Sequence, residues 1–381
     1  MSIKKVLKTA EFQHPHFPKY LGIHYTPEDF DFHSDQNTCD WKWHANQNAI
    51  AEIKAKGGQI SRIDACTIQS HQTQEILNFI HTHKKNHYVI QHFSQQISGL
   101  EVIIPENTII QKPLNLNIDV FNQLSSNYSL LLNLGTNSRI TINQQVIIAG
   151  QASNASLIMI GSQNDNSQLK LTTTILNHSN LNLVLFGNLD AARDCQTVWS
   201  LTPGIHGGLL GDVAINLNGQ GSFGRLNVLK TGTVSDHCGL QASVNHYAPH
   251  TKSRINMRGV LFGKSKVNFT SIGNIVKGAS GSDAQQESRL MTVGETTHGT
   301  VNPVLLIDEN DVNAGHAASV GQYDLDELYY LLSRGIPIMQ ARKILVYDFI
   351  SPVIQEFDKR IQKIITAAIE MGSGESFNDN L

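Results

Sequence analysis

Apolar and polar residues alternate in short runs between residues 99 and 306. The clearest runs are residues 114–120, 139–143, 169–172, 213–218 and 266–269. An alternation with a period of two predicts β-strands that bury one face. No long helical pattern interrupts this region of roughly two hundred residues, and this excludes an arrangement of alternating strands and helices.

The segments between these runs are rich in small and polar residues. The glycines recur at irregular spacing, and we expect them in turns: Gly135, Gly150, Gly161, Gly187, Gly211, Gly232 and Gly263. This pattern fits a sandwich, a propeller or a β-solenoid. The strand faces contain many Asn, Thr, Ser and Ile residues, and this favours the solenoid because stacked coils allow polar side chains to bond to one another along the stack.

Helical patterns flank the β region. Residues 46–56 and 73–84 predict two helices in a small N-terminal helical domain, and Ile76, Leu77 and Ile80 support the second helix by their spacing. The helices at the two ends would cover the open ends of a solenoid. We expect three domains, with boundaries at residues 1–98, 99–323 and 324–381.

The C-terminal domain begins with a predicted helical hairpin. Asp324 is the expected N-cap, Glu327 follows three residues later, and Gly335 ends the first helix. Pro337 then opens the next helix.

A last amphipathic helix follows in the C-terminal domain. Ser351 is its expected N-cap and Pro352 its first residue, and the helix is expected to end near Gly372. The remaining tail, residues 373–381, is expected to be disordered.

Charge and composition restrict the partners. The chain has 381 residues, a formal net charge of -3 and a pI near 6.6. Charges of both signs are mixed along the chain, so we expect no nucleic-acid partner and no anionic membrane partner. The apolar runs are too short to span a bilayer, and we therefore expect a soluble cytoplasmic protein.

Cysteine and histidine are the residues that could bind a metal. Cys39, Cys66, Cys195 and Cys238 form no Cys-x-x-Cys pair, so we expect reduced structural thiols. The pair His246 and His250 is interrupted by Pro249, and no second cluster at zinc spacing accompanies it or His237, which speaks against a zinc site. His81, His83 and His87 are expected to be solvated.

His316 is the candidate functional residue. A neutral imidazole can bind iron or carry protons near neutral pH. The small side chains of Gly315 and Ala317 would let a second surface approach it. The alternative interpretation is an ordinary histidine on a strand.

Several separated motifs, in order, resemble the SufB/SufD family of iron-sulfur cluster assembly proteins. They are residues 246–253 (HYAPHTKS), 259–261 (GVL), 273–279 (GNIVKGA) and the segment 301–349. The resemblance runs from about Thr197 to Phe357. In its length, and in the absence of cysteine beside His316, the chain is similar to the SufD branch of this family rather than to the longer, cysteine-bearing SufB branch.

This resemblance implies a right-handed parallel β-helix core flanked by N-terminal and C-terminal α-helical domains. It also implies a non-catalytic subunit of an assembly scaffold, paired with a SufB-like subunit and a SufC-like ABC-type ATPase, with a homodimer in isolation. His316 would lie at the interface where a transient iron-sulfur cluster is assembled, as a candidate metal ligand. No cofactor would be bound stably by this chain alone, because cluster thiolates would have to come from a partner.

The resemblance further implies that the C-terminal helices bind the ATPase. The candidate docking residues are Tyr329, Tyr330, Arg334 and Arg342, since Tyr and Arg are favoured as interface anchors. Capping and ordinary surface charge are the alternative explanation for Asp324, Glu327 and Arg334.

Two other functions compete with the scaffold subunit. One is a carbohydrate-active β-helix enzyme, a polysaccharide lyase or hydrolase, but acidic residues are sparse in the strand region. The other is a self-sufficient metal-binding or structural protein.

Overall fold

A computed structural model describes residues 40–64, 68–83, 86–94, 98–121, 125–149, 154–177, 180–232, 235–294 and 296–376. Its strands form two nine-stranded sheets. Sheet A contains, in spatial order, β1 (Asp40–Ala45), β4 (Leu114–Phe121), β6 (Arg139–Ala149), β8 (Gln168–Asn177), β10 (Gln196–Gly204), β12 (Phe223–Gly232), β14 (Lys252–Phe262), β16 (Ser282–Val293) and β18 (Val312–Gly321). Sheet B contains, in spatial order, β2 (Gln59–Asp64), β3 (Ser98–Ile104), β5 (Ser125–Leu134), β7 (Asn154–Gln163), β9 (Leu181–Ala191), β11 (Gly207–Leu217), β13 (His237–His246), β15 (Lys266–Ile275) and β17 (His298–Ile307).

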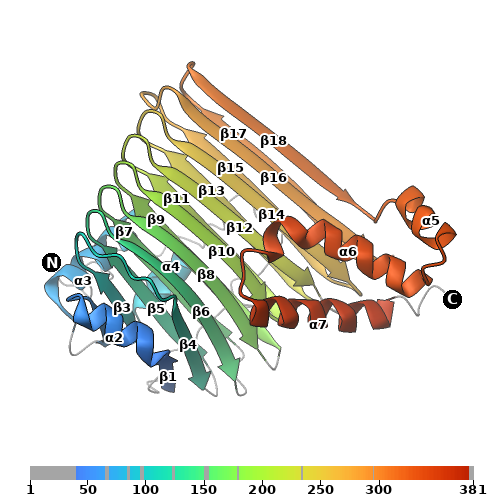
Figure 1. Cartoon of the computed structure of the whole chain (residues 1–381), viewed down its shortest axis with the longest axis horizontal. Helices are drawn as coiled ribbons and strands as arrows, with labels where there is room; N and C mark the ends of the chain where they lie inside the picture. The colour runs from blue at the N-terminus through green and yellow to red at the C-terminus, as the bar shows by residue number, and fades with distance from the viewer. Residues whose placement is uncertain are drawn as a thin grey trace.

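From β3 onward, successive strands alternate between the two sheets. Each strand pairs in parallel with the strand two places along the chain, as β12 does with β14. The chain therefore winds as a β-solenoid, and Figure 1 shows its coils stacked from the N-terminal to the C-terminal end. The predicted parallel β-helix is confirmed. Four of the five predicted strand segments lie within strands, and the fifth, residues 213–218, extends one residue beyond the end of β11 at Leu217.

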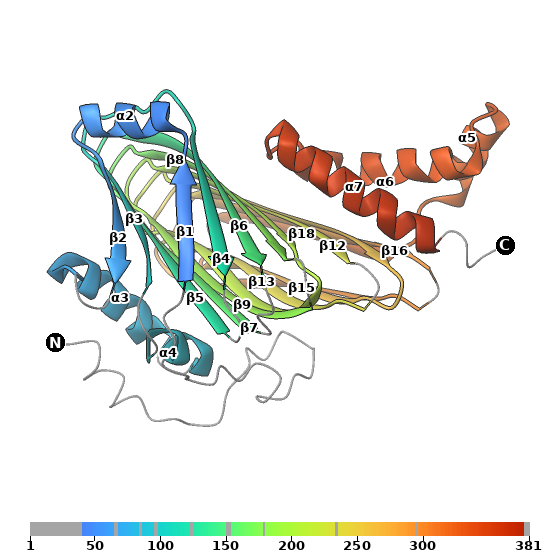
Figure 2. The ribbon, with the colours of Figure 1, turned by 90° about the horizontal axis from the view of Figure 1, so that it is seen from below.

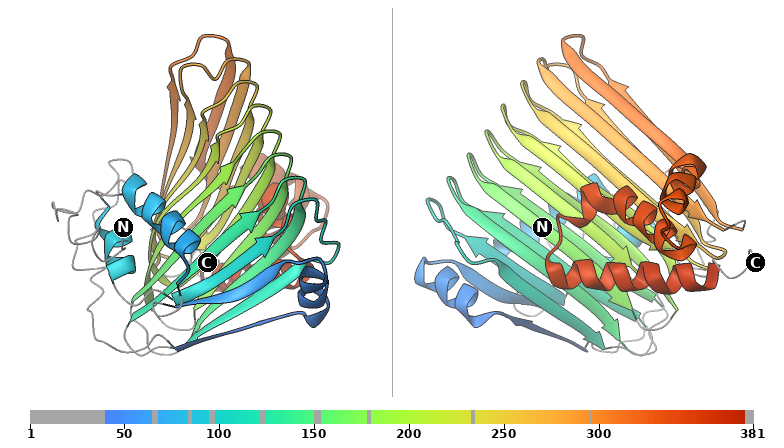
Figure 3. Two further views of the ribbon diagram at one scale, coloured as in Figure 1. Left: turned by 90° about the vertical axis from the view of Figure 1, so that its left-hand side faces the viewer. Right: turned by 45° about the vertical axis from the view of Figure 1, so that its right-hand side comes forward.

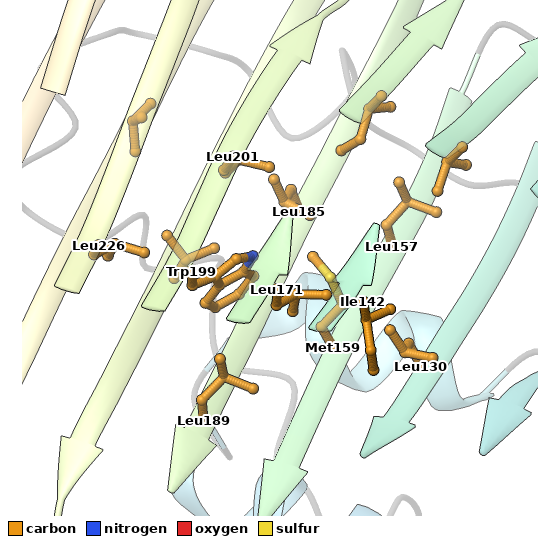
Figure 4. Close-up of a cluster of buried hydrophobic side chains, with 14 of the residues drawn as sticks. Leu130, Ile142, Leu157, Met159, Leu171, Leu185, Leu189, Trp199, Leu201 and Leu226 are labelled. Carbon is orange, nitrogen blue, oxygen red and sulfur yellow. The ribbon is translucent and has the colours of Figure 1, made fainter. Parts of the chain in front are cut away.

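Apolar side chains from both sheets fill the space between them. Figure 4 shows one section, in which Trp199 lies among leucine, isoleucine and methionine side chains from both sheets. Trp199 is fully buried and its indole nitrogen donates to Thr173 Oγ1 at 3.2 Å. Each buried side chain of this size contributes about 1.5–3 kcal/mol relative to an exposed one, so this lumen is the main source of stability of the solenoid.

Polar side chains stack along the coils, as the composition predicts. At one corner Asn137 donates to Asn107 at 2.8 Å, and Asn166 donates to Asn137 at 2.9 Å. All three adopt positive φ angles of 55–57°, which Asn tolerates better than most residues. Each amide bonds to the next coil, so these turns support one another.

Several glycines predicted in turns lie within strands instead. Gly135 and Gly263 are in turns, whereas Gly161, Gly187, Gly211 and Gly232 belong to β7, β9, β11 and β12, and Gly150 lies outside the described residues. A Cβ atom on Gly187 would lie 2.6 Å from Cη2 of Trp199. This glycine is required by a large neighbour in the lumen, which a local sequence pattern does not reveal.

The N-terminal end of the solenoid is covered. The predicted helices correspond to α2 (Gln47–Ala55) and α3 (Ser70–Thr82), and the structure adds α4 (His87–Ser94), β1 and β2. β1 and β2 pair antiparallel with β4 and β3, and Ala49 and Ile53 of α2 join the apolar lumen. Figure 2 shows α2 lying across this end. The region before residue 99 is therefore a mixed cap rather than a purely helical one.

Three helices follow the last strand: α5 (Leu325–Ser333), α6 (Ile338–Ile354) and α7 (Lys359–Ser376). Asp324 is confirmed as N-cap, since its side chain accepts from the Asp326 N–H at 2.8 Å. Gly335 adopts a φ of 82° just after α5, as expected of a helix-terminating glycine.

The predicted start of the last helix at Ser351 is wrong. α6 continues through Ser351 and Pro352 to Ile354, and Asp358 caps α7 by accepting from the Arg360 and Ile361 N–H groups at 2.8 and 2.9 Å. Pro352 removes one N–H donor to the carbonyl four residues earlier, and because α6 ends two residues later, any bend it causes affects only the end of the helix. α7 extends to Ser376, beyond the predicted end at Gly372, and residues 377–381 of the expected tail lie outside the described residues.

The helices α6 and α7 pack on the outer face of sheet A (Figure 3). Their contact with the sheet is an apolar cluster that includes Val346, Ile350 and Val353 from α6 and Leu229 and Val260 from the sheet. This cluster joins the C-terminal helices to the middle of the solenoid. No helix in the described part of the chain is both long and apolar enough to cross a membrane.

Candidate functional site at the open end of the solenoid

The C-terminal end of the solenoid differs from the covered N-terminal end. β17 and β18 are the outermost strands of their sheets, and no further strand of the described chain pairs with them. Apolar side chains are accessible there: Leu306 is 46%, Ile307 39% and Val320 46% exposed. An edge with unpaired backbone groups and exposed apolar side chains is suited to pairing with another chain.

His316 lies at this end, in the middle of β18. Its register partners in the preceding coils are Gln286, Ile255 and Leu226. Ile255 and Leu226 belong to the apolar lumen, and neighbours in register share one face of a sheet. His316 therefore faces the lumen side of β18, and it is exposed because no coil of the described chain covers it.

The lumen beneath His316 is polar. Gln286 and Ser288 on β16 are buried, and so is Ser271 on β15. Ser288 Oγ donates to Ser271 Oγ at 3.2 Å, and Gln286 Nε2 donates to the Val304 carbonyl at 2.9 Å. We call His316, Gln286, Ser288 and Ser271 the mouth of the solenoid.

The described residues do not form a complete metal site. No three His, Cys, Asp or Glu side chains among them stand close enough to hold one metal ion. Cys195 and Cys238 are buried free thiols, and burial raises the pKa of Cys238 to about 12, so this residue stays a thiol rather than a metal-binding thiolate. Cys39 and Cys66 lie outside the described residues. Among the mouth residues His316 is the one side chain of a type that commonly binds iron, and a cluster held there would need ligands from a second chain.

The other histidines that the sequence draws attention to are not at the mouth. His246 is fully buried, with Nδ1 2.7 Å from Thr251 Oγ1 and Nε2 2.8 Å from Ser253 Oγ. Burial lowers its pKa to about 4, so it is neutral at physiological pH and both ring nitrogens are occupied. His250 occupies a turn with a φ of 56°. His246 is thus a structural residue that links a turn to β14.

A second accessible surface lies on α5. Tyr329 is 74% and Tyr330 57% exposed, and the Arg334 guanidinium lies 5.1 Å from the centre of the Tyr330 ring. Arg342 is half-buried on α6, 5.9 Å from the Tyr323 ring. Two of the four predicted docking residues therefore lie on α5 and a third, Arg334, lies at its C-terminal end, whereas the fourth packs against the segment between β18 and α5.

β18 connects the mouth to this helix. The strand ends at Gly321, five residues after His316, and α5 begins at Leu325. A cavity of about 560 Å³ separates the ends of β14, β16 and β18 from α5 and α6, and its lining includes Arg258 and Phe349. Figure 1 shows α5 as the continuation of β18.

The sequence pattern does not reveal the roles of two residues that contribute to this geometry. Glu356, just after α6, lies 3.0 Å from Lys170 Nζ and 3.6 Å from Arg225 Nη1. Gln286 is one polar residue among many in β16, and only the register with His316 distinguishes it. Both roles depend on contacts between segments far apart in sequence.

Known proteins share this core. The profile described as SUF system FeS cluster assembly, SufBD core domain, matches residues 119–349, which is more than half of the chain. The iron-sulfur cluster assembly protein SufD of Bacillus subtilis (strain 168) is 36% identical over 179 residues, which cover 47% of this chain and 41% of that protein. SufD of Escherichia coli (strain K12) is 26% identical over 159 residues, covering 42% of this chain and 38% of that protein.

A third relative is an iron-sulfur cluster assembly SufBD family protein of Mycobacterium tuberculosis (strain ATCC 25618 / H37Rv). It is 26% identical over 158 residues, which cover 42% of this chain and 19% of that protein. The matched segments thus span less than half the length of each of these relatives. The family match, the solenoid fold and the two relatives named SufD agree with one another. The chain belongs to the SufBD family of the SUF iron-sulfur cluster assembly system, and it resembles the SufD members of that family.

Proposed function

We propose that this chain is a non-catalytic, SufD-like subunit of a cytoplasmic scaffold on which iron-sulfur clusters are assembled. It pairs with a SufB-like subunit through the open end of its solenoid and binds a SufC-like ABC-type ATPase through its C-terminal helices. Family membership favours this function over a carbohydrate-active β-helix enzyme. The observation that carries the proposal is the exposed imidazole of His316 on an edge strand, β18, whose outer side pairs with no strand of the described chain.

The open end supports the pairing. β17 and β18 present unpaired backbone groups and the exposed side chains of Leu306, Ile307 and Val320. A partner solenoid that adds its own edge strands would satisfy these groups and cover the mouth. In the absence of that partner, a second copy of this chain would pair in the same way as a homodimer.

The nascent cluster is the cargo of this interface rather than a resident cofactor. His316 supplies one nitrogen ligand, and the thiolates that usually hold an iron-sulfur cluster come from the partner. This division agrees with the lack of a three-ligand group among the described residues.

The C-terminal helices provide the link to the ATPase. Tyr329, Tyr330 and Arg334 form an exposed aromatic and cationic surface, which is the composition typical of interface anchors. A displacement of α5 would act on β18 through the short segment after Gly321. ATP-dependent movement of the bound ATPase would thereby favour one of two states of the mouth, because it makes different contacts in each.

Co-expression with the SufB-like and SufC-like proteins of the same organism tests the proposal. We expect the three chains to purify together and to form a cluster when iron and sulfide are supplied without oxygen. His316→Ala should leave the complex intact and lower the cluster yield, whereas the control His298→Ala, an exposed histidine on the neighbouring edge strand, should not.

Two results would contradict the proposal. One is that the chain fails to associate with either protein. The other is a stable, stoichiometric cluster on the isolated chain, because it would show that no partner ligand is needed.

A further inference from the structure

Beneath His316 the apolar lumen of the solenoid gives way to polar side chains, although Leu290 on β16 still belongs to the apolar cluster. Along the column that leads to His316, Leu226 and Ile255 are apolar core residues, and the next residue in register is Gln286. In the adjacent column Met257 is followed by Ser288. The side chains beneath the mouth thus change from apolar to polar within one coil.

Only one of the two polar groups of the Gln286 side-chain amide forms a hydrogen bond. It is only 5% exposed, and its Nε2 donates to the Val304 carbonyl at 2.9 Å. Its Oε1 is buried and has no hydrogen-bond partner among the described residues. A buried acceptor without a donor costs free energy, so a donor that can reach this oxygen would be stabilising.

The imidazole of His316 is the donor in the right place. His316 follows Gln286 in register on the neighbouring strand, on the same lumen side of sheet A. Strands in a sheet lie about 4.8 Å apart, so the two side chains are within reach of each other. The residues two positions before and after His316 are Ala314 and Ala318, which leave space for the ring to turn.

The ring of His316 is also unoccupied. Among the described residues none forms a hydrogen bond with it. His246, deeper in the same solenoid, has both ring nitrogens held by the hydroxyls of Thr251 and Ser253. The fold therefore holds both ring nitrogens of His246. At His316 it provides one free acceptor, the Gln286 oxygen, and leaves the other ring nitrogen without a partner among the described residues.

We infer that Gln286 is the positioning residue for His316: once the ring turns toward β16, Oε1 accepts its N–H and holds the imidazole with its other nitrogen facing out of the mouth. The inference deepens the proposed function, on which the cargo at His316 depends. An N–H that is held by a protein acceptor fixes the tautomer, and the second nitrogen then carries the lone pair that binds a metal. The partner subunit would meet an imidazole that is already oriented.

The tautomer of His316 tests this inference without any cluster. The full chain is labelled with ¹⁵N-histidine, and the ring signals of His316 are identified by their loss in His316→Ala. Spectra are taken at about pH 8, where neutral imidazole is the form compared in all variants. We expect one tautomer to dominate in the wild type, and Gln286→Met, which keeps the side-chain length without the acceptor, to change the tautomer ratio by about fivefold.

Two variants serve as controls. Gln241→Met removes a buried glutamine whose Oε1 also lacks a partner but which lies on β13, and it should leave the ratio unchanged. Gln286→Glu retains an acceptor and should keep the wild-type ratio. If Gln286→Met does not fold, Gln286→Asn withdraws the oxygen by one methylene and should shift the ratio in the same direction.

The outcomes separate this inference from the proposed function. An identical ratio in the wild type and in the folded variant lacking the acceptor overturns the inference, whatever the cluster yield. In the three-chain complex, Gln286→Met should lower the cluster yield by about tenfold, the scale of changes beside a metal ligand. A third outcome is a shifted tautomer ratio in Gln286→Met together with full cluster yield in both Gln286→Met and His316→Ala. This outcome would support the orienting role of Gln286 and reject the role of His316 in cluster assembly.

Discussion

Lys170 on β8 and Glu356 at the end of α6 form an ion pair of 3.0 Å between segments that are far apart in sequence. Arg225 on β12 lies 3.6 Å from the other carboxylate oxygen of Glu356. One carboxylate thus joins the C-terminal helices to two strands of sheet A. The first of these C-terminal helices is α5, which directly follows β18, the strand that carries His316.

Reversing the charge at this position should loosen the attachment of the helices. In Glu356→Lys the new ammonium faces Lys170 and Arg225, so attraction is replaced by repulsion. Because the residues are partly exposed, we expect the unfolding free energy to fall by about 1 kcal/mol. Hydrogen exchange measured by mass spectrometry should rise in α6 and α7 and stay unchanged in β5–β11.

Glu370→Lys is the matched control. Glu370 pairs with Lys343 at 3.4 Å, so the same charge reversal there acts on a contact between α6 and α7. Equal exchange in α6 and α7 for the two variants would show that Glu356 is not an anchor.

A methyl group at Gly187 should be costly. The added Cβ would lie 2.6 Å from Cη2 of Trp199 and 3.0 Å from the Met159 carbonyl, and neither can move easily in a packed lumen. Overpacking of this kind destabilises by about 1–3 kcal/mol. The midpoint of thermal unfolding should therefore fall in Gly187→Ala.

Gly321→Ala provides the comparison, because a Cβ there has no atom within 4 Å. We expect its thermal midpoint to equal that of the wild type. A Gly187→Ala variant as stable as Gly321→Ala would mean that the lumen around Trp199 is not packed tightly.

Local patterns predicted the elements of the fold better than their contacts. The alternation of apolar and polar residues located the strands because one face of each strand is buried in the lumen, and the side chain of Asp324 located the start of α5. Ser351 failed as a cap because apolar packing of Ile350 and Val353 on sheet A keeps α6 helical through that position. The choice of a solenoid over a sandwich came from the family resemblance, since strand alternation alone does not determine which strands pair.

The candidate site was predictable only in part. His316 could be chosen from its motif, and the structure places it on an exposed edge strand. Its relation to Gln286 depends on the register of β16 and β18, which are separated by the whole of β17. Glu356 likewise meets Lys170 only through the packing of the helices on sheet A.

Acid should destabilise the chain through His246. Burial lowers the pKa of His246 to about 4 in the folded state, whereas the unfolded value is about 6.5. Below about pH 6.5 the unfolded chain takes up a proton that the folded chain does not, so stability is present above this pH and is lost down to about pH 4. The loss from this group is on the order of 3 kcal/mol.

Urea unfolding at a series of pH values checks this prediction. His246→Gln should reduce the change in unfolding free energy between about pH 6.5 and pH 4, whatever its stability at neutral pH. The exposed His298, replaced by Gln, provides the comparison, and the change that we assign to His246 should persist in this variant. An unchanged slope in His246→Gln would show that His246 is protonated in the folded state.

The exposed aromatic residues of α5 should be needed for ATPase binding but not for folding. Tyr329 and Tyr330 are 74% and 57% exposed, so their replacement by Ala removes little packing within the chain. If they anchor the SufC-like ATPase, the double variant should weaken its binding at least about tenfold, as the loss of an interface anchor does. Calorimetric titration of the purified ATPase into the chain measures this affinity.

Met371→Ala is the control, because Met371 on α7 is an equally exposed apolar residue at 76%. This variant should bind the ATPase as the wild type does. Unaltered affinity in the double tyrosine variant would place the docking surface elsewhere on the C-terminal helices.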